Sequence, residues 1–212
     1  MSDRADRLKS MLRGAASAAR RGIGGLTPVA KVRQAMRDLG QRRTQVPGEV
    51  LNAALADTPG VTSVMARAQD GCVRIDATFA DGRALALALR PAGVSFAPHG
   101  PKELSFSVDP PELATDSRVH ALVLATATAI AKTLWAPALR SAEDDTGYAA
   151  AERDGAVLRV DLRTIPIVRA ALRNRATALL LDAIDLGQVL PADGAIQLEM
   201  RLPGMPGRPS PG

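Results

Sequence analysis

The chain has 212 residues, of which 46% are hydrophobic and 23% charged, a balance that excludes a disordered protein and suits one globular core or two small ones. It contains one cysteine, which excludes an internal disulfide and fits a reducing compartment. Charge is unevenly distributed: residues 1–45 hold 11 Lys and Arg against three Asp, whereas the rest of the chain has an acidic excess. We therefore predict a basic N-terminal arm, residues 1–45, joined to a globular body, residues 46–202.

The arm is expected to be partly helical. Leu8, Met11 and Leu12 share one face of a helix predicted over residues 4–21, and residues 41–47 are expected to be a linker. We expect the arm to bind an anionic membrane surface or an acidic partner. Nucleic acid is a less favoured partner, because the arm has no aromatic residue to stack on bases. The side chains expected to bind are Arg4, Arg7, Lys9, Arg13, Arg20, Arg21, Lys31, Arg33, Arg37, Arg42 and Arg43.

The body is predicted to begin with a helix at 49–56 and to continue as antiparallel strands up to residue 110. Apolar residues in this stretch recur with a period of two, as at Val73 and Ile75, which is typical of strands with one buried face. Asp81-Gly82 predicts a hairpin turn. Further strands are expected around Leu85–Leu89, Val94–Phe96 and Leu104–Val108, with a turn at Pro98–Pro101.

Thr115-Asp116 is expected to cap a long helix that extends to about Ala136. Because this segment is apolar nearly all round, we expect it to be buried against a sheet. A membrane span is the alternative, which Lys132 in the middle of the segment disfavours. The later elements are predicted as strands at 147–152, 156–162, 179–186 and 195–202, a short helix at 165–173, and a disordered tail at 203–212.

Part of the sequence is repeated after an interval of 84 residues. Residues 62–73 run in step with residues 146–157, and both copies contain an Asp-Gly turn between two predicted strands. The predicted fold class is therefore α+β: antiparallel sheets packed on a long buried helix, with an internal duplication of a helix-plus-hairpins unit. The two halves would be 46–111 and 115–202. Coincidence is the alternative explanation, since Asp-Gly hairpins are common.

Motifs of catalysis are missing from the sequence. It has no Gly-rich phosphate loop, no nucleophile elbow, and too few Cys and His residues for a zinc site. His99 is expected in a solvated turn, His120 near the start of the long helix, and Cys72 as an inert thiol. We predict no catalytic residue, no metal and no cofactor. An enzyme that uses His99 or scattered carboxylates is the alternative.

The apolar strand faces and the apolar helix favour an interior that encloses a lipid-like or other apolar ligand, although side chains alone can fill such a core. We predict a non-enzymatic binding protein that carries such a ligand and associates through its arm with the inner face of a membrane, in the cytoplasm. The alternative is a protein–protein adaptor or scaffold whose arm binds an acidic partner or nucleic acid. The expected cavity-lining residues are Val73, Ile75, Phe79, Leu85, Leu87, Phe96, Phe106, Leu122, Ile130 and Trp135.

Overall fold

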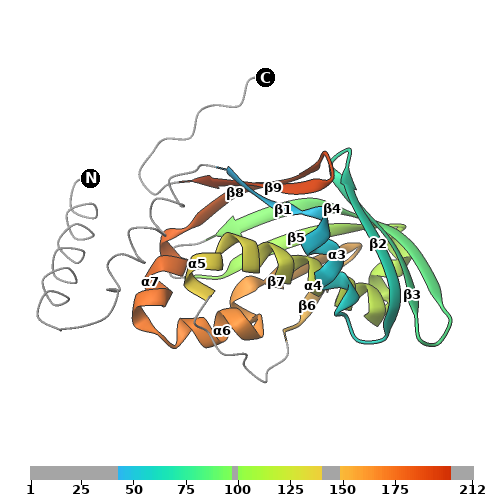
Figure 1. Ribbon diagram of the computed structural model, residues 1–212, viewed down its shortest axis with the longest axis horizontal. Coiled ribbons are helices and arrows are strands. Elements are labelled where there is room, and N and C mark those ends of the chain that lie inside the picture. Colours follow the sequence, from blue (N-terminus) through green and yellow to red (C-terminus); the bar gives the residue numbers. More distant parts are fainter. Residues whose placement is uncertain (1–42, 97–99, 140–148, 202–212) are drawn as a thin grey trace, which may run out of the picture. The chain divides into compact units, whose positions relative to one another are not determined.

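In the computed structural model, which describes residues 43–96, 100–139 and 149–201, antiparallel sheets and several helices form an α+β protein (Figure 1). The strands are β1 (Arg43–Pro47), β2 (Val61–Gln69), β3 (Cys72–Phe79), β4 (Ala84–Phe96), β5 (Lys102–Asp109), β6 (Ala151–Asp154), β7 (Val157–Asp161), β8 (Asp185–Ala192) and β9 (Ala195–Arg201). The helices are α3 (Gly48–Ala56), α4 (Ser117–Leu134), α5 (Ala136–Leu139), α6 (Pro166–Leu172) and α7 (Arg175–Ala183), with 3-10 turns η1 (Pro111–Thr115) and η2 (Leu162–Thr164).

The described strands form two sheets. The six-stranded sheet has the order β2-β3-β4-β5-β7-β6, and the three-stranded sheet has the order β1-β9-β8, with antiparallel neighbours throughout. Alternation along β3 shows why one face of the larger sheet is buried: Val73 and Ile75 are at most 1% exposed, whereas Arg74 and Asp76 lie in solvent.

Two helices pack side by side against these sheets (Figure 1). α3 contacts β2, and α4 contacts α3, β1, β6 and β7. The Asp116 carboxylate caps α4 as predicted, because it accepts a hydrogen bond from the Arg118 backbone N–H at 2.8 Å. α4 buries nine of its eighteen residues, while Ser117 and Lys132 are exposed. The helix is thus buried along one side and borders solvent along the other.

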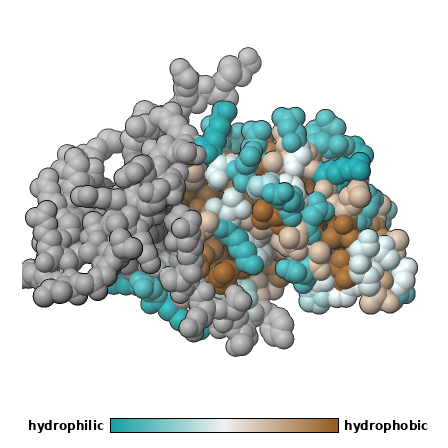
Figure 2. All heavy atoms as spheres, in the orientation of Figure 1, coloured by the Kyte–Doolittle hydropathy of each residue, from teal (hydrophilic) through white to brown (hydrophobic). Residues whose placement is uncertain are grey.

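None of the helices described is long and apolar enough to cross a membrane. On the side of the molecule shown in Figure 2, hydrophilic and hydrophobic residues alternate over the described surface rather than forming one continuous apolar face.

Several sequence-based predictions of secondary structure differ from the structure. The strands expected at Leu85–Leu89 and Val94–Phe96 are one continuous strand, β4, and the strand expected at 147–152 begins only at Ala151. Residues 43–47 of the expected linker form strand β1, because Val46 is fully buried and pairs with Ile196 of β9. The strand expected at 179–186 is mostly helix α7, which ends at Ala183 before β8 begins at Asp185. A short apolar run suits either element when periodicity is the only signal.

Several predictions concern residues outside the described part of the chain. These are the helix and the basic residues of the arm before residue 43, the turn that contains His99, the first two residues of the strand expected at 147–152 and the tail from residue 203. The predicted helix at 165–173 corresponds to α6, and the Asp81-Gly82 turn joins β3 to β4 as expected.

Candidate functional site

The candidate site lies at the start of β5, where a buried lysine meets two aromatic side chains. Lys102 is only 2% exposed, and its Nζ lies 5.3 Å from the centre of the Phe96 ring. Phe96 stacks on Trp135 with 6.2 Å between ring centroids and 22° between ring planes. Trp135 is 1% exposed, and its indole Nε1 has no hydrogen-bond partner among the described residues. We call these three residues the lysine–tryptophan cluster.

The fold positions each member of the cluster. Phe96 ends β4 and lies directly opposite Lys102, the first residue of β5. Trp135 follows the last turn of α4 as its C-cap residue. Lys102 occupies an inward-facing position, because the residues that alternate with it along β5, among them Leu104 and Phe106, are all buried. Lys102 therefore occupies a position at which the alternation of the strand predicts an apolar side chain.

Charged groups from three other elements influence Lys102. Burial lowers the pKa of its ammonium group and is the largest effect. Asp182 of α7 and Asp185 of β8 raise this pKa, and Arg163 of η2 lowers it. Because the net shift is downward, the two carboxylates do not fully offset the loss of hydration. The ammonium ion is less stable here than in water.

The backbone around the cluster is fixed by Asp161 and Arg163. The Asp161 Oδ1 atom accepts hydrogen bonds from the backbone N–H groups of Lys102 at 3.2 Å and of Arg163 at 3.0 Å. The Arg163 guanidinium donates through Nη1 to the Gly100 carbonyl oxygen at 2.8 Å. The start of β5 and the η2 turn are therefore held together by polar contacts.

The cluster combines two hydrogen-bond donors with aromatic surface. An ammonium group and an indole N–H can each bind an acceptor oxygen, and the rings offer contact to an apolar chain. Such a combination suits a ligand with a polar end and an apolar body. Among the residues described, no group of three His, Cys, Asp or Glu side chains is placed to hold a metal ion.

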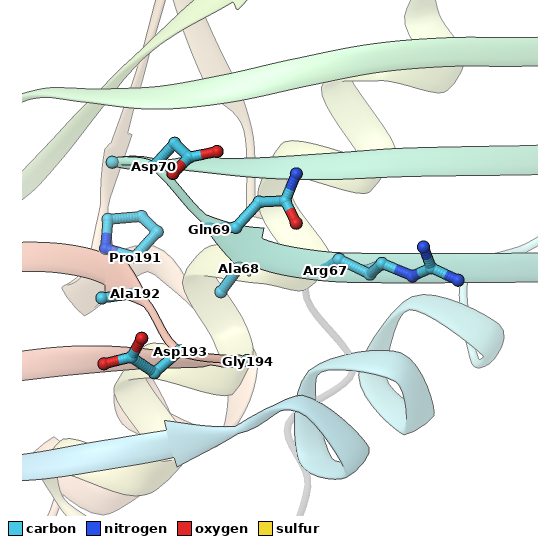
Figure 3. Close-up of a pocket in the computed structure, with 10 residues that line it drawn as sticks. Arg67, Ala68, Gln69, Asp70, Pro191, Ala192, Asp193 and Gly194 are labelled. Carbon is cyan, nitrogen blue, oxygen red and sulfur yellow. The ribbon is translucent and has the colours of Figure 1, made fainter.

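A concave feature, separate from the lysine–tryptophan cluster, lies between the β2–β3 and β8–β9 turns (Figure 3). This groove of about 660 Å³ has Asp70 and Asp193 on its opposite walls. Two reciprocal hydrogen bonds join the turns: Gly71 N–H donates to the Pro191 carbonyl at 3.0 Å, and Gly194 N–H donates to the Ala68 carbonyl at 2.9 Å. The two turns thereby link the two sheets. Both aspartates are exposed, so their presence is explained as that of charged turn residues in contact with water.

The predicted cavity-lining residues belong to the core. Nine of the ten are buried, and Phe96 is half-buried. Burial is expected both for a ligand cavity and for a core filled by its own side chains, so their role in lining a cavity stays a prediction. The structure brings Phe96 and Trp135 into direct contact, and both belong to the lysine–tryptophan cluster.

Contacts within the fold explain three further residues that the sequence analysis names, His120, Cys72 and Arg43. The His120 ring Nε2 lies 2.8 Å from the Ala114 carbonyl oxygen, which places it as a core-edge contact. Alternation with Arg74 would place Cys72 on the exposed face of β3, but Cys72 is 1% exposed, and its Sγ donates to the Gln69 carbonyl at 3.3 Å. Arg43 pairs with Glu199 at 3.9 Å within the body rather than belonging to the arm.

Sequence reasoning missed Lys102 and the charged groups that surround it. One signal was available: the inward-facing alternation of Leu104, Phe106 and Val108 extends back to position 102. The contributions of Arg163, Asp182 and Asp185 depend on tertiary packing, and no local pattern indicates them.

Comparison with protein-family models, curated proteins and solved structures finds no match for this chain. Its function is therefore argued from the α+β fold and from the candidate site alone.

Proposed function

We propose that this is a non-catalytic binding protein that carries a lipid-like ligand and associates with an anionic membrane surface through its basic arm. The observation that carries the proposal is the lysine–tryptophan cluster, in which a buried ammonium group and an indole N–H adjoin stacked aromatic rings. Ligand sites of this kind are mainly apolar and contain few polar groups, which fix the orientation of the ligand.

The charge distribution supports the membrane part of the proposal. Residues 1–45 have eight more basic than acidic side chains, and the remainder of the chain is slightly acidic. Each Lys or Arg near an anionic bilayer contributes roughly 1 kcal/mol to binding. The arm therefore meets an anionic surface first, because the same surface repels the body.

Extraction of the purified full-length protein tests the ligand part. We expect organic solvent to release an amphiphile that mass spectrometry detects in stoichiometric amount. A matched variant, Trp135→Ala, removes the aromatic stack and should contain less of it. Protein that repeatedly contains no extractable amphiphile, whatever the expression host, contradicts the ligand part of the proposal.

Liposome flotation tests the arm. In the full-length chain, the ten Lys and Arg residues that precede Arg43 are changed to Gln, and the control variant carries Arg67→Gln, Arg74→Gln and Arg90→Gln on the exposed sheet face. We expect the arm variant to lose flotation with anionic vesicles and the control to keep it. Raising the salt to about 1 M should abolish wild-type flotation, since the screening length falls to roughly 3 Å.

An adaptor function is the second candidate, and the outer face of the six-stranded sheet favours it. Thr78, Ala84 and Ala86 are exposed there on neighbouring strands β3 and β4. These small side chains leave room for another protein to pack against this part of the sheet. An adaptor should contain no extractable amphiphile, and substitution of Ala86 by Arg should weaken its capture of a partner.

We include internal duplication in the adaptor proposal, because a repeated helix-and-hairpin unit would form the scaffold of an adaptor. The β2–β3 hairpin turns at Asp70-Gly71, whereas in the β6–β7 hairpin Asp154 still pairs with Val157 and the turn residues are Gly155 and Ala156. The two Asp-Gly pairs of the repeat are therefore offset by one residue relative to their turns. The β8–β9 hairpin supports a further copy, because it also follows a helix and turns at Asp-Gly. Around those turns Val73, Ile75 and Asp76 correspond in sequence to Ile196, Leu198 and Glu199.

A further inference from the structure

We propose that the ligand is an anionic amphiphile, and that its carboxylate or phosphate head group is held by the Lys102 ammonium group and the Trp135 indole N–H. This inference rests on the proposed ligand-carrying function and names the chemical class of the ligand. The apolar chain of the ligand would follow the aromatic rings of Phe96 and Trp135.

The first support is the geometry of the two donors, which adjoin the same phenyl ring. Lys102 Nζ lies 5.3 Å from the Phe96 centroid, and the Trp135 ring stacks on Phe96 at 6.2 Å. Both donor residues are at least 98% buried. The indole N–H has no acceptor among the described residues, and a buried donor left without an acceptor destabilises the protein. An acceptor oxygen from a ligand would remove that destabilisation.

The second support is electrostatic. Burial lowers the pKa of Lys102 by more than Asp182 and Asp185 raise it, and Arg163 lowers it further. Lys102 and Arg163 thus bring two positive charges to the cluster, and Asp182 and Asp185 offset only part of the cost of burying the Lys102 ammonium group. A ligand anion supplies the negative charge that favours the ammonium form, whereas a neutral alcohol or ester does not.

The experiment uses the intrinsic fluorescence of the full-length protein, because Trp135 is the only tryptophan in the chain. After removal of any co-purified lipid, the protein is titrated with decanoate, decyl phosphate, decanol and inorganic phosphate. We expect saturable changes in Trp135 emission with decanoate and decyl phosphate. Decanol should bind at least about tenfold more weakly, since it lacks a charge-assisted hydrogen bond.

Lys102→Met keeps an unbranched apolar side chain and removes the charge. It should weaken decanoate binding about tenfold and leave decanol binding unchanged. Lys132→Met is the matched control, because Lys132 is an exposed lysine on α4, and it should change neither. Trp135→Phe, followed by calorimetry, removes the N–H and keeps a stacking ring. It should weaken the binding of both anions.

Wild-type protein provides a test that needs no variant. Burial lowers the pKa of Lys102, so raising the pH from 7 toward the ordinary lysine value of 10.5 deprotonates its ammonium group earlier than that of an exposed lysine. Decanoate binding should weaken over this range and decanol binding should not.

Three results overturn the inference in distinguishable ways. If decanol binds as tightly as decanoate and Lys102→Met changes neither, the head-group assignment fails while the carrier function survives. If inorganic phosphate matches decyl phosphate, the site takes a free anion and the ligand is not an amphiphile. If no amphiphile changes Trp135 emission and none is extracted from the protein, the proposed carrier function fails as well.

Discussion

At the scale of single residues, Asn52 of α3 takes the place of a neighbouring strand at the edge of the six-stranded sheet. Its Oδ1 accepts a hydrogen bond from the Ala66 N–H at 2.7 Å, and its Nδ2 donates to the Ala66 carbonyl at 3.0 Å and to the Gly48 carbonyl at 2.8 Å. The side-chain amide thus satisfies both backbone groups of Ala66, which an edge strand would otherwise leave open to another chain.

We predict that Asn52→Ala lowers the free energy of unfolding by about 1–3 kcal/mol, because Ala66 is 5% exposed and both of its backbone groups would lose their partner. Urea denaturation followed by Trp135 fluorescence measures the loss. Thr62→Val is the control: it removes an exposed hydrogen bond on the same strand and should change stability by less than about 0.5 kcal/mol. Equal effects of the two variants would contradict this role of Asn52.

The lowered pKa of Lys102 predicts how stability depends on pH. The unfolded chain keeps the ordinary lysine value, so between the folded pKa and about 10.5 it binds more protons than the folded protein. The free energy of unfolding therefore contains a contribution from Lys102 that rises with pH in this window. Comparison of wild type with Lys102→Met at pH 8, 9 and 10 should show a smaller rise in the variant. Parallel pH profiles would rule out a lowered pKa.

At the same scale, the sequence predicts part of the candidate site. Phe96 and Trp135 are named from their apolar character alone, and the structure stacks them. Lys102 is missed because lysine is ordinarily an exposed residue, and its inward position depends on the register of β5 with β4. The influence of Asp182 and Asp185 on Lys102 requires α7 and β8 to pack near β5, which local patterns do not encode.

At the scale of elements, the sequence predicts secondary structure correctly where a specific side chain marks a cap or a turn. It fails where a short apolar run is the only signal. The Asp116 cap and the Asp81-Gly82 turn are predicted from side-chain chemistry, and both are confirmed. β1 is missed because it has five residues and gains its stability from pairing with β9. α7 is mistaken for a strand because its leucines are consecutive. A continuous apolar run shows neither the period of a helix nor that of a half-buried strand.

The start of α3 and the β8–β9 turn are in close contact. A Cβ atom added at Gly48 would lie 2.7 Å from the Gly194 carbonyl oxygen, a backbone atom that can move only together with the turn. We predict that Gly48→Ala destabilises the protein by about 1–3 kcal/mol, despite the higher helix propensity of alanine.

The control for Gly48 is Gly93→Ala in β4. Its new Cβ would lie 3.8 Å from the Ser105 Cβ, an ordinary van der Waals contact, and stability should change by less than about 0.5 kcal/mol. Chemical denaturation of both variants makes the comparison. If Gly48→Ala proves as stable as Gly93→Ala, the turn must move freely with respect to α3.

At the scale of the whole molecule, the sequence predicts the class of fold but not the connection between its sheets. Alternating strands and Asp-Gly turns indicate antiparallel sheets with helices, and the structure has them. The sequence does not show that β1 joins β8 and β9 in a separate sheet, or that two turns link this sheet to the larger one. Both features depend on contacts between segments more than 100 residues apart, as between Gly71 and Pro191.

Because β1 pairs with β9, the folded body begins at residue 43, and truncation of the chain tests this boundary. A chain that starts at residue 42 keeps β1, whereas one that starts at residue 48 loses the fully buried Val46 and the five pairs between β1 and β9. Burial of a valine side chain alone is worth about 1.5–3 kcal/mol, and the loss of β1 also exposes the edge of β9 to water. We therefore expect the shorter chain to unfold at a distinctly lower urea concentration than the longer one, with Trp135 fluorescence as the readout. If the two truncated chains unfold at the same concentration, residues 43–47 are the linker that their sequence suggests and β1 is not part of the fold.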